Sequence, residues 1–145
     1  MQETEAAVKI EQFIRDVPDF PVKGVIFKDI TPLMGNHKGM KAAVRMIHDY
    51  FKDRKIDYVV GIESRGFIFG SLLADRLSAG FVPVRKPGKL PYKTLSKSYS
   101  LEYGTNTIEI HTDAIPAGAR VLMVDDLLAT GGTMAAACEL VRQLG

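Results

Sequence analysis

The chain has 145 residues, of which 46% are hydrophobic and 25% charged, and its net charge is +2. These values exclude a disordered chain and allow a sizeable core, whereas the charge is too small to indicate a nucleic-acid partner. No apolar run is long enough to cross a membrane, and no signal-peptide pattern is present. With one cysteine, Cys138, we expect no disulfide and a cytoplasmic protein.

The N-terminal part is expected to begin with a helix. Apolar residues at helical spacing between Ile10 and Val17 predict an amphipathic helix over residues 3–17. Pro18 and Pro21 cannot continue it and favour an extended segment. A second helix is predicted from His37 to about Lys52 by the same apolar periodicity.

Two strands that end in polar loops follow. Asp57–Ile62 reads as a strand, and a glycine-bearing turn then leads into a helix that ends near Leu77. Arg65 at the start of that helix opposes the helix dipole, so an anion is expected beside it. The next strand, Gly80–Arg85, runs into the cations Lys86 and Lys89. A run of cations like this one can simply be exposed to solvent. Because it is expected to face a loop that suits an anion, it is also suited to bind phosphate groups.

Residues 91–111 form a polar insertion between core strands. Tyr99–Tyr103 and Thr107–His111 can pair as a hairpin across Gly104–Asn106. A long polar insertion of this kind is a candidate lid, and an ordinary exposed hairpin remains the alternative.

The most informative stretch is Val121–Thr133. An apolar strand, Val121–Val124, runs into Asp125 and Asp126, and the small-residue loop Ala129–Thr133 then opens a helix. Free N–H groups at a helix start, together with threonine hydroxyls, suit a phosphate. The two carboxylates would repel that phosphate. They are suited instead to bind sugar hydroxyls, or a magnesium ion whose ligands are largely water molecules. A plain strand–turn–helix junction explains neither aspartates nor threonines, so the stretch predicts a ribose 5-phosphate site.

Strands that alternate with helices predict an α/β fold with a mostly parallel central sheet flanked by helices. Such sheets bind ligands beyond the carboxyl ends of their strands, where all three polar loops fall.

Val121–Thr133 closely resembles the phosphoribosyl-diphosphate (PRPP) signature of the type I phosphoribosyltransferases. Four further segments are similar to the branch of that family that acts on adenine: Phe20–Ile30, Gly61–Phe67, Arg85–Pro91 and Tyr99–Gly104. The resemblance implies the type I phosphoribosyltransferase fold, with an N-terminal hood-like segment and a flexible β-hairpin lid. It also implies a single domain, residues 1–145. Residues 1–34 would supply the N-terminal helix and the purine-pocket segment, and residues 35–145 the core, with the lid at about 91–111.

The implied activity is purine salvage, in which the 5-phosphoribosyl group of PRPP is transferred to adenine to give AMP and diphosphate. Mg²⁺ would be bound through the diphosphate, with Asp125 and Asp126 contributing at most through water. The resemblance further suggests a homodimer, with Lys28–Lys38 contributing to its interface.

The resemblance also assigns residues to roles. Catalysis is assigned to Arg65, Asp125, Asp126 and Glu102, the last for the proton of adenine N9, although a solvated hairpin glutamate is the alternative there. Adenine would be bound by Ile26, Phe27 and Leu127. Binding of PRPP or AMP is expected from Ser64, Arg65, Arg85, Lys86, Lys89, Tyr103, Asp125, Asp126, Ala129, Thr130, Gly131, Gly132 and Thr133.

Two alternatives to a working enzyme are open. One is a non-catalytic regulatory module that binds a nucleotide or PRPP, although such modules are expected to lose residues of the kind retained here. The other is an inactive short form, because members of the family normally continue beyond Gly145. In that case the sheet edge beside Val121–Val124 would be left uncovered, and we expect lower stability than in an extended chain.

Overall fold

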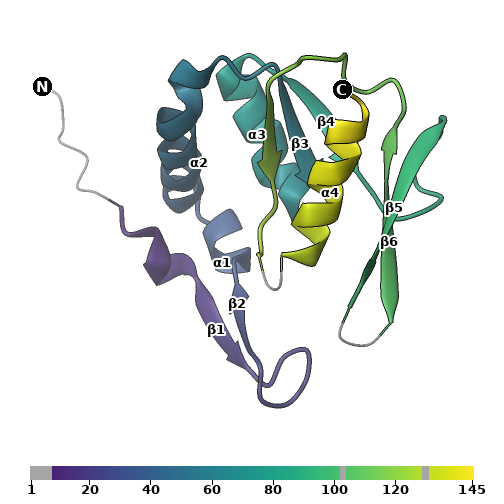
Figure 1. Cartoon of the computed structure of the whole chain (residues 1–145). Helices are drawn as coiled ribbons and strands as arrows, with labels where there is room; N and C mark the ends of the chain where they lie inside the picture. The colour runs from purple at the N-terminus through teal and green to yellow at the C-terminus, as the bar shows by residue number, and fades with distance from the viewer. Residues whose placement is uncertain (1–7, 102–103, 129–130) are drawn as a thin grey trace, which may run out of the picture. The chain divides into compact units, whose positions relative to one another are not determined.

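A computed structural model describes residues 8–101, 104–128 and 131–145 and divides the chain into two compact units, residues 1–50 and 51–145 (Figure 1). The domain limits expected from the sequence remain a prediction. Within the described residues, no helix is long and apolar enough to span a membrane.

The first unit contains a hairpin followed by two helices. A short 3-10 helix (η1, Ile10–Phe13) precedes the antiparallel strands β1 (Arg15–Pro18) and β2 (Ile26–Asp29). Helices α1 (Thr31–Met34) and α2 (His37–Phe51) follow, and α2 confirms the helix predicted from His37. The hood-like segment that the resemblance implies for this part of the chain stays a prediction.

The helix predicted over residues 3–17 is wrong in its described part. Only one 3-10 turn forms, and the chain is then extended, with Val17 opposite Phe27 in the β1–β2 ladder. The prolines restrict the residues before them to extended backbone, and pairing with β2 supplies the backbone hydrogen bonds that a helix would have supplied. Residues 3–7 lie outside the described part of the chain.

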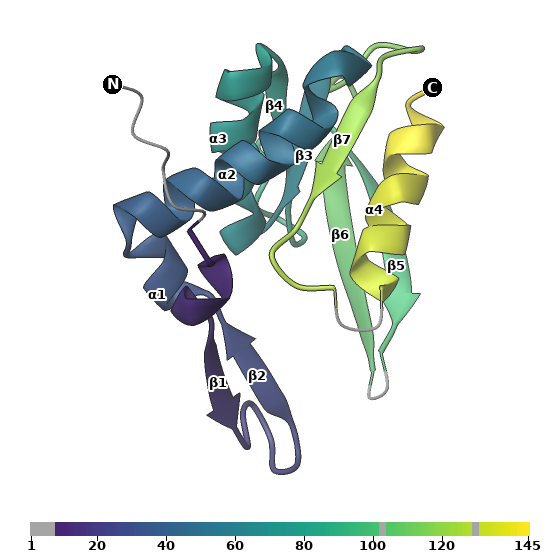
Figure 2. The same cartoon turned by 90° about the vertical axis from the view of Figure 1, so that its left-hand side faces the viewer.

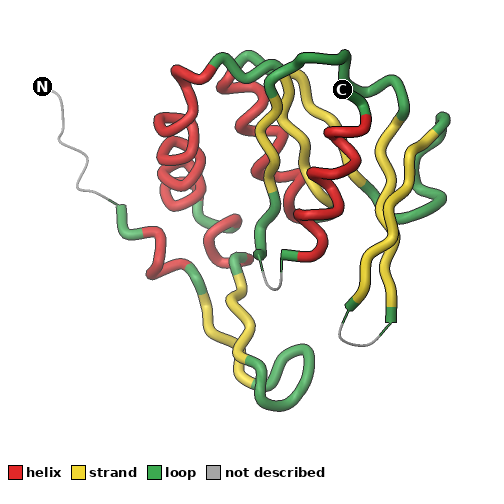
Figure 3. The backbone as a smooth tube through the Cα atoms, in the orientation of Figure 1, coloured by secondary structure: helices red, strands yellow, loops and turns green. Residues whose placement is uncertain are grey.

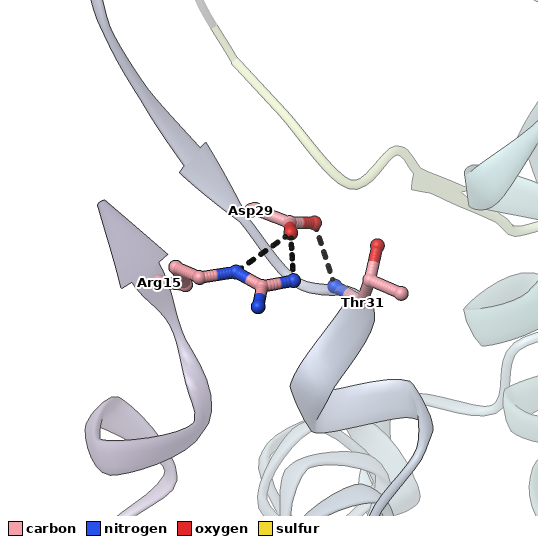
Figure 4. A network of polar contacts seen from close by, with 3 residues as sticks. All are labelled: Arg15, Asp29 and Thr31. Carbon is pink, nitrogen blue, oxygen red and sulfur yellow. Dashed lines mark hydrogen bonds and ion pairs between the residues drawn. The ribbon is translucent and has the colours of Figure 1, made fainter. Parts of the chain in front are cut away.

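A polar network fastens this hairpin to α1 (Figure 4). The Asp29 carboxylate accepts hydrogen bonds from Arg15 Nη2 at 2.9 Å, from Arg15 Nε at 3.3 Å and from the Thr31 N–H at 2.9 Å. Hydrogen bonds from Thr31, and then those from Arg15, lower the pKa of Asp29 to about 2. The carboxylate therefore stays charged and holds both strand ends at the start of α1.

The second unit is built on a parallel sheet in the order β4–β3–β7. Its strands are β3 (Tyr58–Ile62), β4 (Gly80–Val84) and β7 (Val121–Val124), which confirms the expected parallel arrangement. Each of the three strands was predicted, because a strand buried on both faces is a nearly continuous apolar run. A 3-10 turn (η2, Lys52–Arg54) precedes the sheet.

Helices α3 (Arg65–Leu77) and α4 (Gly132–Gln143) cover opposite faces of this sheet (Figure 1). On one face Val60 and Val84 pack in a buried cluster with Leu140 of α4 and with Ile108 and Ile110. On the other face α3 approaches so closely that Phe81 fills the space beside Gly61 and Gly70. Successive strand residues alternate between these faces, so both helices are fixed by the same three strands.

Strands β5 (Thr94–Ser100) and β6 (Thr105–His111) form a separate antiparallel hairpin, seen as a pair of yellow strands in Figure 3. The hairpin lies along α4 (Figure 2). A hairpin was expected, but its extent was wrong: pairing ends at Ser100 and Thr105. Leu95, Lys97 and Tyr99 are the half-buried positions that alternate along β5. The serines between these positions are polar, and one of the half-buried positions is itself a lysine. The alternation of apolar and polar residues that predicts a strand is therefore weak in this sequence.

Candidate active site

The carboxyl ends of β3, β4 and β7 open onto one pocket in the second unit. Its volume is about 300 Å³, and its lining combines three cations with three carboxylates and the start of α4. The lining residues are Ile62, Glu63, Arg65, Val84, Arg85, Lys86, Tyr99, Asn106, Thr107, Ile108, Asp125, Asp126, Leu127, Leu128, Gly131, Gly132, Thr133 and Met134. Because parallel strands end at the same edge, residues far apart in the sequence meet here.

Gly66 allows α3 to begin directly against the end of β7. A Cβ atom on Gly66 would lie 3.0 Å from the Val124 carbonyl oxygen and 3.3 Å from Asp125 Oδ1, so a larger residue would push the elements apart. This close approach places Arg65 Nε 2.9 Å from Asp126 Oδ2. The anion that the sequence predicted beside Arg65 therefore includes a carboxylate of the protein itself. The peptide bond before the helix, Glu63–Ser64, is cis.

One end of the pocket is basic and is held by Glu63. Its Oε1 accepts hydrogen bonds from Arg85 Nε at 3.0 Å and from the Lys86 N–H at 3.3 Å. Burial alone would raise the pKa of Glu63, but the Lys86 and Arg85 hydrogen bonds and charges together hold that pKa below its usual value. Glu63 is therefore a carboxylate at neutral pH that holds the Arg85 side chain and the backbone of Lys86. It was not among the predicted residues.

The other end of the pocket is the start of α4. Gly131 caps the helix with φ at +84°, a left-handed conformation that favours glycine, and Gly132 and Thr133 form the first turn. The Thr133 hydroxyl donates a hydrogen bond of 2.8 Å to the Tyr99 hydroxyl, which joins β5 to this turn. The backbone N–H groups of a helix start, together with neighbouring hydroxyls, are suited to a phosphate group.

Asp125 and Asp126 line the same pocket. The Asp126 N–H donates to Asp125 Oδ1 at 2.8 Å, while the Asp126 carboxylate pairs with Arg65. Burial, and next the neighbouring Asp126 carboxyl, raise the pKa of Asp125 to about 7, against a partial opposing effect of Arg65. Near neutral pH the pair therefore carries a proton that can leave when a cationic ligand approaches.

This raised pKa predicts a pH-dependent stability. A carboxyl group whose pKa rises on folding stabilises the fold below its ordinary pKa, and that contribution is lost as pH rises through about 7. Between pH 4 and pH 8 we expect the unfolding free energy of the wild type to fall relative to that of Asp125→Asn. The size should be on the order of 1 kcal/mol, because about half of the group still faces solvent. Urea unfolding of both proteins across this range checks it, and a difference that does not vary with pH would contradict it.

Several predicted residues do not line the pocket. Lys89 and Ser64 are exposed and lie outside its lining, whereas Leu127 is part of it. Ile26 and Phe27 belong to the first unit. The predictions for Glu102, Tyr103, Ala129 and Thr130 fall outside the described residues.

The pocket also contains residues that the sequence analysis missed. Tyr99, Asn106 and Thr107 come from the facing strands of the hairpin, and Leu128 and Met134 flank the start of α4. The sequence gives little indication that these residues line a site, because none belongs to a motif and the position of each depends on how the hairpin packs.

The carboxylates of Asp125 and Asp126 are the pocket's candidate ligands for a hard cation. Among residues 8–101, 104–128 and 131–145, no three histidine, cysteine or acidic side chains gather closely enough to hold a metal ion. Asp125 and Asp126 fit a magnesium ion that takes most of its ligands from water or from a bound phosphate.

The fold and this site define a phosphoribosyltransferase. The family model described as "Phosphoribosyl transferase domain" matches residues 30–145. A curated adenine phosphoribosyltransferase from Halothermothrix orenii is 59% identical over 137 residues, which cover 94% of this chain and 81% of that protein. The chain therefore belongs to the phosphoribosyltransferase family and, within it, to the adenine phosphoribosyltransferases.

Solved structures agree with this assignment. The adenine phosphoribosyltransferase of Thermoanaerobacter pseudethanolicus is 54% identical with a TM-score of 0.91, covering 94% of this chain and 79% of that one. The Saccharomyces cerevisiae enzyme is 45% identical with a TM-score of 0.89, covering 95% of this chain and 81% of that one. The latter was solved in complex with D-2,5-dideoxy-2,5-imino-altritol 1,6-bisphosphate and adenine.

Proposed function

We propose that this chain transfers the 5-phosphoribosyl group of PRPP to adenine, giving AMP and diphosphate, as a purine-salvage enzyme. The observation that carries the proposal is a single pocket whose lining brings together the phosphate-suited start of α4, the cations Arg65, Arg85 and Lys86, and the aspartates Asp125 and Asp126. These three kinds of group suit the phosphate, the diphosphate and the ribose of PRPP. Membership of the adenine phosphoribosyltransferases supports adenine as the acceptor.

In this proposal Gly131, Gly132 and Thr133, with Ala129 and Thr130, bind the 5-phosphate. The 5-phosphate does not react, so its binding energy can position the reacting carbon at the other side of the ribose. The hydrogen bond from Thr133 to Tyr99 leaves the Tyr99 hydroxyl proton able to point at the bound anion.

The aspartates act on the ribose. Displacement at the anomeric carbon develops positive charge on the sugar, which nearby carboxylates stabilise electrostatically. Asp126 is kept in place by Arg65, and Asp125 is held by the backbone of Asp126. Both carboxylates can also accept hydrogen bonds from the ribose hydroxyls.

The leaving diphosphate gains negative charge, which Arg65, Arg85 and Lys86 stabilise from the basic end of the pocket. Lys89 and the Ser64 backbone are proposed to join them when the ligand binds. Magnesium would enter with the diphosphate and neutralise part of its charge, with Asp125 and Asp126 contacting it at most through water.

Adenine is proposed to bind against Leu127, with Ile26 and Phe27 of the first unit supplying backbone and aromatic contacts. Glu102 would receive or relay the proton of N9, and Tyr103 would help to bind PRPP. We further propose a homodimer with Lys28–Lys38 at its interface, and a cytoplasmic location.

The reaction is tested by incubating the chain with Mg²⁺, PRPP and, in parallel, adenine, hypoxanthine or guanine, while diphosphate and nucleotide are measured. AMP from adenine, with no product from the other two bases, is the expected result. Nucleotide formed from hypoxanthine or guanine at a comparable rate would contradict the proposed specificity. Tight PRPP binding without turnover of any base would instead favour a regulatory binding module.

A further inference from the structure

Glu109 of β6 lies where the hairpin joins the central sheet. Its backbone exchanges two hydrogen bonds with Arg85, at 3.0 Å from the Arg85 N–H and 2.7 Å to the Arg85 carbonyl oxygen. These bonds fix the end of β4 to the middle of β6. The residue is therefore positioned by backbone contacts before its side chain is considered.

The Glu109 side chain bridges the hairpin and the basic loop, by which we mean residues 85–89. Oε1 accepts the Gly88 N–H at 3.0 Å. Oε2 accepts the Ser96 hydroxyl at 2.6 Å and the Thr94 hydroxyl at 3.0 Å. The Ser96 and Gly88 hydrogen bonds, with a smaller one from Thr94, lower the pKa of Glu109 against a weak effect of burial. At neutral pH the group is a carboxylate with both oxygens engaged.

The basic loop is held at two N–H groups by two carboxylates. Glu63 accepts from the Lys86 N–H and Glu109 accepts from the Gly88 N–H, on either side of Pro87. Lys86 lines the pocket, whereas Glu109 does not. Removing the Glu109 carboxylate would leave Gly88 without the acceptor that the structure gives it and would loosen the loop on the side away from Glu63.

We propose that Glu109 is a positioning residue that fixes the basic loop and thereby sets the affinity of the pocket for the diphosphate end of its ligand. The inference rests on the proposed function and deepens it. Its consequence is an asymmetry between ligands. The affinity for diphosphate depends on the loop, whereas AMP carries only the phosphate that belongs at the start of α4. Loss of Glu109 therefore weakens the binding of diphosphate and leaves the binding of AMP nearly unchanged.

The test is direct binding of Mg²⁺-diphosphate and of AMP, measured by calorimetry on the wild type, Glu109→Ala and Glu109→Gln. For Glu109→Ala we expect a roughly tenfold weaker Kd for diphosphate, as for one lost charge-assisted hydrogen bond, and an AMP Kd within about twofold of the wild type. Glu109→Gln should recover most of the affinity. Its amide oxygen can still accept from Gly88, and the two hydroxyls can accept from its NH₂ group.

Glu139→Gln is the matched control. It removes the ion pair between Lys97 and Glu139, at 2.7 Å, which joins the same hairpin to α4 without touching the basic loop. Both affinities should stay unchanged in this variant. If Glu109→Ala does not fold, Thr94→Val with Ser96→Ala removes both hydroxyls that hold the carboxylate and should weaken diphosphate binding about threefold.

Three results would overturn the inference. Diphosphate affinity could be unchanged in every variant that frees or removes the carboxylate, or AMP affinity could fall as much as diphosphate affinity, which is the sign of a general loss of structure. A wild type that binds neither ligand would overturn the proposed function and this inference together. A wild type that binds both, with no selective effect of the variants, would leave the function standing and reject only the role of Glu109.

Discussion

Asp126→Asn is expected to lower kcat for AMP formation by about 10²–10³-fold, with a much smaller change in KM for PRPP. The Asp126 side chain is only 11% exposed, and in such a partly buried position charge that develops on the ribose is stabilised more strongly than in water. Asparagine keeps the shape of the side chain and loses that charge. Since the charge on the sugar appears only in the transition state, the loss should fall on kcat.

Steady-state kinetics of Asp126→Asn beside Asp113→Asn provides the measurement. Asp113 is an exposed aspartate of the same unit that does not line the pocket, so its variant should match the wild type. A kcat for Asp126→Asn within a few fold of the wild type would mean that this carboxylate does not act on the ribose.

Arg85→Ala is expected to raise KM for PRPP about 10–100-fold, the range for loss of a hydrogen bond to a charged group. Two effects contribute to this increase. In the proposed arrangement the diphosphate loses a cation of the pocket lining, and Glu63 loses the 3.0 Å partner that offsets its negative charge there. KM for adenine should change little, because the base is proposed to bind against Leu127 and not beside Arg85.

The double variant Glu63→Gln with Arg85→Ala separates these two effects. If part of the loss comes from the Glu63 carboxylate repelling diphosphate, the double variant should bind PRPP more tightly than Arg85→Ala alone. An unchanged KM for PRPP in Arg85→Ala would remove Arg85 from the proposed diphosphate site.

The sheet and its ligand loops could be predicted because their signals are local. Val121–Val124 is a continuous apolar run, as a strand buried on both faces requires, and the glycines and threonines after it stand in sequence order. The helix predicted from His37 is also local, since its apolar positions recur at helical spacing. The chemistry expected at these loops came from residue types and from the family resemblance, and the roles of single residues stay a prediction.

What the sequence did not reveal depends on contacts between distant residues. Val17 has helical spacing with its neighbours, yet it pairs with Phe27 in a strand ladder. Glu63, Tyr99 and Glu109 gain their importance from partners 22, 34 and 21 residues away in the chain. No local sequence pattern predicts such contacts, because they form only when the sheet brings the strand ends and the hairpin together.

A crystal structure of the chain with AMP, Mg²⁺ and diphosphate would test the proposed site directly. We expect the 5-phosphate within hydrogen-bond distance of the Gly131–Thr133 turn, the ribose hydroxyls on Asp125 and Asp126, and the diphosphate against Arg85 and Lys86. A 5-phosphate bound at the basic loop, or a nucleotide bound outside this pocket, would contradict it.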